Sequence, residues 1–165
     1  MPPPAAIAKS PSTRLAQGLV FLLGAVLTYV LLADEPRLFY RVPITLGIVY
    51  LVAAAVGGRD GGHWSTACVL CGWGLAVVAL QDWDLDMNAA SAYLAGAGLG
   101  ALVAGGLERV GVSAALLGVA GTILIAGLVF GLEDDVGEVL DAATYAYLLA
   151  AVGVVNLALA FGGRR

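Results

Sequence analysis

Six long stretches of the chain contain no aspartate, glutamate, lysine or arginine. They cover residues 15–33, 42–58, 61–81, 87–107, 110–132 and 142–163. At about 1.5 Å per residue, each stretch would form a helix roughly 25–35 Å long, which matches the hydrocarbon thickness of a bilayer. The pattern therefore predicts six membrane-spanning helices, over residues 15–33, 42–58, 63–81, 88–107, 111–132 and 142–163.

The composition supports a membrane protein with no separate soluble domain. Hydrophobic residues make up 61% of the chain, charged residues make up 12%, and the mean hydropathy is +0.94. A soluble domain needs a larger share of polar residues for its surface. We expect an all-α polytopic membrane helix bundle over residues 15–165. Residues 1–14, rich in proline and serine, are expected to form a disordered cytoplasmic tail. The first stretch is expected to be retained, because residues 33–36 make a poor signal-peptide cleavage site.

The positive charges predict the orientation. Lysine and arginine close to span ends favour the cytoplasmic side. With the N-terminus inside, six of these residues fall inside (Lys9, Arg14, Arg59, Arg109, Arg164 and Arg165) and only Arg37 and Arg41 fall outside. We therefore expect a cell-membrane protein with both termini in the cytoplasm. The acidic residues of the opposite surface are interpreted as a solvated rim, because residues 82–86 lack the turn glycine of a calcium loop.

Similar residue patterns recur at the span ends, as they would in an internal repeat. Outward spans end in acidic residues, and returning spans end in a glycine pair followed by arginine, as at Gly57, Gly58 and Arg59. Three tandem helical hairpins of about 50 residues would produce this pattern. Charge bias and helix-end glycines would produce it equally well without a repeat. The sequence leaves both explanations open.

Small residues predict close helix packing inside the bilayer. Lipid tails compete equally for apolar side chains, so helices associate where small residues let their backbones approach. The fourth span has Gly96 and Gly100 four residues apart, and Ala97 and Ala101 repeat that spacing. We expect this helix to pack on more than one side and to lie centrally in the bundle.

The pair Cys68 and Cys71 is the one arrangement that resembles a reactive site. Its C-x-x-C spacing is similar to that used by membrane enzymes related to vitamin K epoxide reductase and by quinone-linked disulfide-forming proteins. Those proteins also use a second cysteine pair, and this chain has only two cysteines. We expect the thiols to pack as small apolar groups. His63, the single histidine, is expected to be an interfacial loop residue rather than a metal ligand.

The absence of charged residues inside the spans argues against several functions. Ion-coupled carriers and pumps need ionisable groups within the membrane, and intramembrane hydrolysis needs a base. We expect no cofactor and no metal. Nucleic-acid binding is not expected either, because the cations are scattered and the net charge is −4. Among the polar residues inside spans, Asn156 needs hydrogen-bond partners, either at a helix contact or along a polar path.

Three functions remain from the sequence. The favoured one is a non-enzymatic membrane component that acts by helix packing with itself, as a homo-oligomer, or with a partner membrane protein. The second is passive or facilitated transport of a small neutral solute along a path lined by Gly96, Gly100, Thr122 and Asn156. The third is a thiol-redox protein that uses Cys68 and Cys71.

Overall fold

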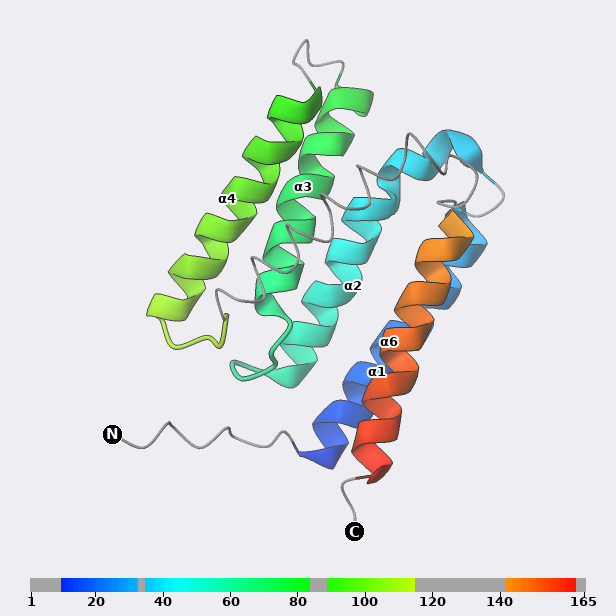
Figure 1. Cartoon of the computed structure of the whole chain (residues 1–165), viewed down its shortest axis with the longest axis vertical. Coiled ribbons are helices and arrows are strands. Elements are labelled where there is room, and N and C mark those ends of the chain that lie inside the picture. Colours follow the sequence, from blue (N-terminus) through cyan, green and yellow to red (C-terminus); the bar gives the residue numbers. More distant parts are fainter. Residues whose placement is uncertain (1–9, 33–34, 84–88, 115–141, 163–165) are drawn as a thin grey trace.

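The computed structural model describes residues 10–32, 35–83, 89–114 and 142–162, and within these ranges every regular element is a helix (Figure 1). The elements are α1 (Pro11–Leu32), the 3-10 helix η1 (Pro36–Arg41), α2 (Val42–Gly57), α3 (Trp64–Asp82), α4 (Ala89–Arg109) and α6 (Ala142–Gly162). The expected all-α class is therefore confirmed for the described part of the chain.

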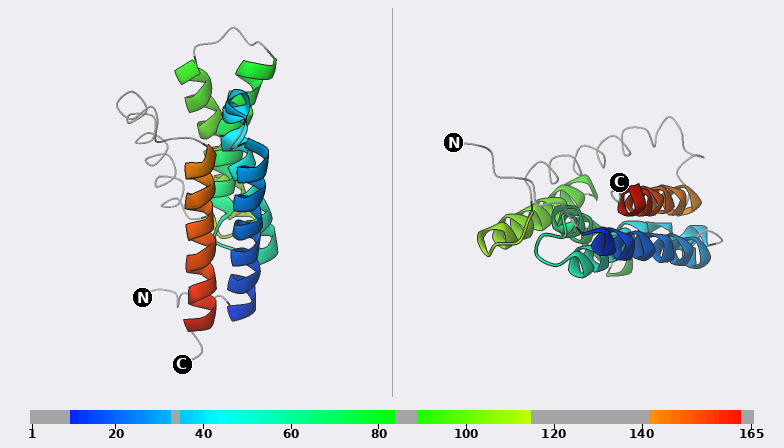
Figure 2. Two further views of the ribbon diagram at one scale, coloured as in Figure 1. Left: turned by 90° about the vertical axis from the view of Figure 1, so that its right-hand side faces the viewer. Right: turned by 90° about the horizontal axis from the view of Figure 1, so that it is seen from below.

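Helices α1 to α4 lie side by side in a layer, and α6 packs against the helix at one edge of this layer. Along the layer the order is α4, α3, α2 and α1, and α6 packs against α1 (Figures 1 and 2). The interface between α1 and α6 is the most extensive in the described residues, and α2 packs more extensively on α3 than on α1. Helix α2 thus packs on both α1 and α3, and the described helices do not divide into separate hairpins.

Within the described residues, three helical segments are long and apolar enough to cross a membrane, namely Pro11–Leu32, Arg37–Gly57 and Trp64–Asp82. A shorter apolar helical stretch, Tyr145–Val154, lies within α6. The expected span over 111–132 lies outside the described residues from 115 onward. Residues 110–114 form a turn and a non-helical stretch, with Gly111 at φ 80°.

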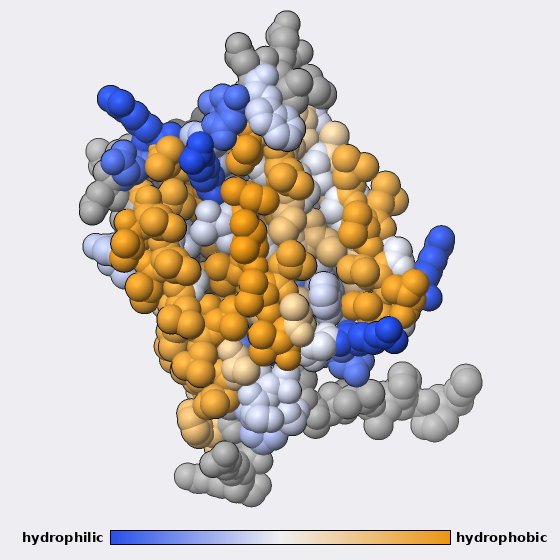
Figure 3. All heavy atoms as spheres, turned by 180° about the vertical axis from the view of Figure 1, so that it is seen from behind, coloured by the Kyte–Doolittle hydropathy of each residue, from blue (hydrophilic) through white to orange (hydrophobic). Residues whose placement is uncertain are grey.

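On the face seen in Figure 3, the described hydrophilic side chains gather toward the two ends of the bundle. The start of α1, the end of α6, the 58–63 loop and the end of α4 share one end, and η1 lies at the other (Figure 1). Between these ends the visible face is predominantly apolar (Figure 3). Large side chains such as Leu23 (65% exposed) and Val30 (68% exposed) project outward from α1. An apolar outer surface bounded by charged ends is the arrangement that a bilayer requires.

Helix α1 begins earlier than the sequence pattern indicated. Pro11 is its first residue, and the backbone N–H of Thr13 donates to Ser10 Oγ at 3.2 Å. Serine before a first-turn proline is a favourable N-terminal cap. Residues 11–14, expected to belong to the disordered tail, are therefore helical, and residues 1–9 lie outside the described part.

Glycines bring neighbouring helices into close contact throughout the layer. A Cβ added at Gly18 of α1 would lie 2.7 Å from the Leu157 side chain of α6, and one added at Gly24 would lie 2.5 Å from Val49 of α2. A Cβ at Gly47 of α2 would lie 2.8 Å from the Cys71 backbone nitrogen of α3. Small residues therefore provide the close approach that membrane helices need.

A candidate apolar groove and a buried polar cluster

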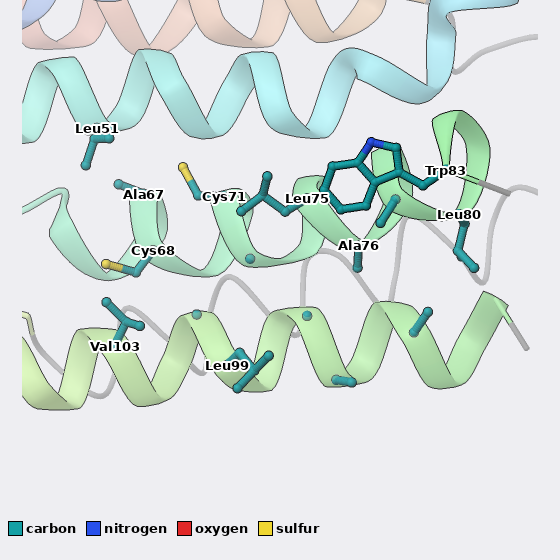
Figure 4. A pocket seen from close by; sticks show the side chains of 16 residues that line it. Leu51, Ala67, Cys68, Cys71, Leu75, Ala76, Leu80, Trp83, Leu99 and Val103 are labelled. Atoms are coloured by element: carbon teal, nitrogen blue, oxygen red, sulfur yellow. The ribbon is translucent and has the colours of Figure 1, made fainter. Parts of the chain in front are cut away.

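An apolar groove of about 630 Å³ runs along the junction of α3 and α4. Its α3 wall extends from Ala67 to Leu80, with Trp83 just beyond the end of that helix. Its α4 wall extends from Ala92 to Val103, and Leu51 of α2 contributes at one side (Figure 4). Almost no polar atom is exposed along it. Its rim includes Leu75 (56% exposed) and Leu99 (63% exposed), so the groove opens onto the apolar outer surface.

The two walls of the groove meet at three glycines, Gly72, Gly96 and Gly100. A Cβ added at Gly96 of α4 would lie 2.5 Å from the carbonyl oxygen of Gly72 on α3. A Cβ at Gly100 would collide with the carbonyl oxygen of Cys68. Backbone therefore packs directly on backbone here, and larger side chains on either side of this contact form the walls of the groove.

Both cysteines line the groove, and both are free thiols. The Cys71 sulphur points toward α2, where a Cβ added at Gly47 would lie 2.9 Å from it, whereas the Cys68 sulphur lies on the side of α4 (Figure 4). Cys68 also packs against the buried cluster of Val69, Ala104 and Ala114. The two sulphurs thus lie in different helix interfaces, as expected for thiols that fill space between helices.

The structure brings together four of the residues singled out from the sequence, since Gly96, Gly100, Cys68 and Cys71 all line this groove. Thr122 lies outside the described residues. Asn156 belongs to α6, which packs on α1 at the other edge of the layer, and its side chain lies outside the described part. The path expected along Gly96, Gly100, Thr122 and Asn156 therefore stays a prediction, because two of its four side chains lie outside the described residues.

Among the described helices α4 lies at one edge of the layer, and the central position expected for it stays a prediction, because most of the expected span over 111–132 lies outside the described residues. Among the described elements its extensive contacts are with α3 alone, and it forms the edge of the layer. Cβ atoms added at Gly98, Gly105 or Gly106 would meet nothing within 4 Å. Among the described residues, Gly96 and Gly100 bring α4 against α3, and Ala97 and Ala101 pack against the buried cluster of Val69, Ala104 and Ala114.

Gln17 is a buried polar residue that the sequence reasoning overlooked. Its side chain has no exposed surface, and its Nε2 donates to the carbonyl oxygens of Ala53 and Gly61, each at 2.9 Å. A Cβ on Gly57 would overlap this amide, so a glycine is needed beside it. The bonds join α1 to the end of α2 and to the loop that follows. Gln17 Oε1 is buried and has no hydrogen-bond partner among the described residues.

His63, expected to be an interfacial loop residue, lies in an aromatic cluster. Its ring centroid is 5.1 Å from that of Phe21 and 5.8 Å from that of Tyr50, and both contacts are edge-to-face. Phe21 and Tyr50 also contact each other at 4.9 Å. The three rings come from α1, α2 and the residue before α3, so no local sequence spacing could have indicated the cluster.

Metal-binding side chains do not converge within the described ranges. These residues contain no group of three or more histidine, cysteine, aspartate or glutamate side chains placed to hold a metal. At the other end of the bundle, Asp82 accepts hydrogen bonds from Tyr40 and from Arg41, and the Arg41–Asp82 ion pair measures 3.2 Å. This acidic residue thus fastens η1 to the end of α3.

Comparison of the chain with protein-family models, with curated proteins and with solved structures gives no match.

Proposed function

We propose that this chain is a multi-pass component of the cell membrane that acts without catalysis, by holding an apolar partner in the groove between α3 and α4. The apolar helices of the structure support the membrane location. The charge-free stretches of the sequence support six spans, and the distribution of lysine and arginine supports cytoplasmic termini.

The groove is the observation that carries the proposal. Its volume of about 630 Å³ falls within the range of roughly 300–1,000 Å³ that is typical of ligand pockets. Its lining offers almost no hydrogen-bonding group, so its contacts with a partner are van der Waals contacts. A polar solute would lose its water there without replacement hydrogen bonds, which favours an apolar partner over a transport substrate.

The packing of the thiols favours binding over redox chemistry. Cys71 contacts the backbone of α2 beside Gly47, and Cys68 faces α4, so neither sulphur is directed at the other. Forming a disulfide would require both to leave these contacts. The thiols therefore contribute apolar lining to the groove.

Site-specific photo-crosslinking in native membranes tests this function. A benzophenone amino acid would replace Leu99, on the groove rim, or Leu23, which is exposed to a similar extent on α1 (63% and 65%). We expect a higher yield of adducts at Leu99 than at Leu23, measured by mass spectrometry, because a partner held in the groove stays beside Leu99. Equal yields of the same adducts at both positions would overturn the proposal.

A further inference from the structure

We infer that the partner in the α3–α4 groove is a single hydrocarbon chain of a membrane lipid, an inference that rests on the function proposed above. The shape of the groove, the chemistry of its walls and its position on the outer surface each support this occupant.

The groove is long and narrow. Its α3 wall runs from Ala67 to Leu80, about 20 Å at about 1.5 Å per residue, and its α4 wall from Ala92 to Val103 is about 17 Å long, against roughly 30 Å for the hydrocarbon thickness of a bilayer. A helix about 10 Å wide and about 20 Å long occupies on the order of 1,600 Å³. The groove provides about 630 Å³, about two fifths of that volume. Its volume therefore suits a linear chain along its axis and is too small for a whole helix.

The walls match a hydrocarbon chain chemically. Alanine and glycine line the bottom of the groove, where Gly72, Gly96 and Gly100 bring α3 and α4 together. Leucine and valine side chains stand on both sides. These groups present methyl and methylene surface and give a chain dispersion contacts from two walls, whereas a chain against a single exposed helix has contacts from one.

The ends of the groove fit the geometry of a lipid molecule. Trp83, 70% exposed, lines the end nearest the polar residues Tyr40, Arg41 and Asp82. Tryptophan favours the depth at which lipid headgroups meet the hydrocarbon. A lipid whose chain lies in the groove would thus place its polar end at Trp83 and direct its chain toward Ala67 and Val103.

Photo-labelling of the full-length protein in vesicles tests the inference. The vesicles would contain phosphatidylcholine and phosphatidylglycerol, with a trace of phosphatidylcholine that carries a diazirine on one acyl chain. Mass spectrometry would locate the adducts. We expect labelling of groove residues such as Leu75 and Leu99 to exceed labelling of equally exposed residues on α1, such as Leu23.

Filling the groove provides the matched variant. Ala95 is exposed and lines the groove, and Ala151 is exposed on α6 away from it. Ala95→Phe should lose the excess labelling of the groove, and Ala151→Phe should retain it. Ala95→Leu, a milder change, repeats the test should Ala95→Phe fail to elute as a single species. Excess labelling that survives in Ala95→Phe or Ala95→Leu would overturn the inference.

Other outcomes separate this inference from the proposed function. Uniform lipid labelling, together with a Leu99 cross-link to a second copy or to another identified membrane protein, would overturn the lipid chain and leave the proposed function standing. A Leu99 cross-link to residues 115–141 of the same chain would overturn both, because the groove would then be filled by the protein itself.

Discussion

Gly72 of α3 and Gly96 of α4 face each other so closely that a Cβ on either residue would strike the carbonyl oxygen of the other. This contact brings the two helices together and sets the depth of the groove beside it. The groove therefore depends on residues without side chains, which is a reason for glycine at these positions despite its cost of about 1 kcal/mol in a helix.

A side chain at this contact should weaken the bundle. Gly96→Val places atoms against the Gly72 backbone, and overpacking of this kind costs about 1–3 kcal/mol. Gly98→Val is the matched control, because Gly98 lies on the same helix with nothing within 4 Å of an added Cβ. Thermal unfolding in detergent micelles should show a lower midpoint for Gly96→Val only. Equal midpoints would show that the contact contributes nothing to stability.

The Gln17 amide should be the most important buried polar group of the described residues. Gln17→Ala removes two hydrogen bonds and leaves the carbonyl oxygens of Ala53 and Gly61 without that donor. The expected cost is about 1–3 kcal/mol. Gln81→Ala, at an exposed glutamine near the end of α3, should change stability little. The same unfolding measurement distinguishes them, and an unaltered Gln17→Ala midpoint would contradict the assigned role.

The sequence predicts the ends of most helices well but not the faces by which they pack. Predicted and observed ends of α2 and α3, and the end of α4, agree within two residues, because charged residues are excluded from the hydrocarbon and mark its limits. The prediction places the start of α1 four residues too late, because it begins after the charged Arg14. The helix begins at Pro11 and is capped by Ser10.

The lateral order of the helices could not be predicted for a physical reason. In water, polar residues mark the outer face of a helix, whereas in lipid both faces are apolar. The chain has 23 glycines, and no pattern distinguished Gly72 at a helix contact from Gly98 in open space. The groove, the aromatic cluster of His63 and the edge position of α4 all follow from this order, so none could be derived beforehand.

The proposed topology predicts that reporters fused to the two termini will occupy the same side of the membrane. The start of α1 and the end of α6 share one end of the bundle, and the lysine and arginine distribution assigns that end to the cytoplasm. A fluorescent reporter at either terminus should fluoresce, and alkaline phosphatase at either terminus should be inactive. Reporters on opposite sides would require an odd number of spans and would contradict the six-span proposal.

Removing both thiols should leave the proposed binding intact. Cys68 and Cys71 line the groove as free thiols held against different neighbouring helices, so the double variant Cys68→Ala/Cys71→Ala changes the lining by two small apolar groups. Lipid labelling at Leu99 should keep its excess over Leu23, and each lost sulphur should cost about 1 kcal/mol or less of stability.

Cys68→Ser/Cys71→Ser, which is similar in size but more polar, should reduce the excess, because hydroxyls in the groove favour water or helix carbonyls over a hydrocarbon chain. Loss of labelling in the alanine variant, with an unchanged unfolding midpoint, would instead assign the thiols a chemical role.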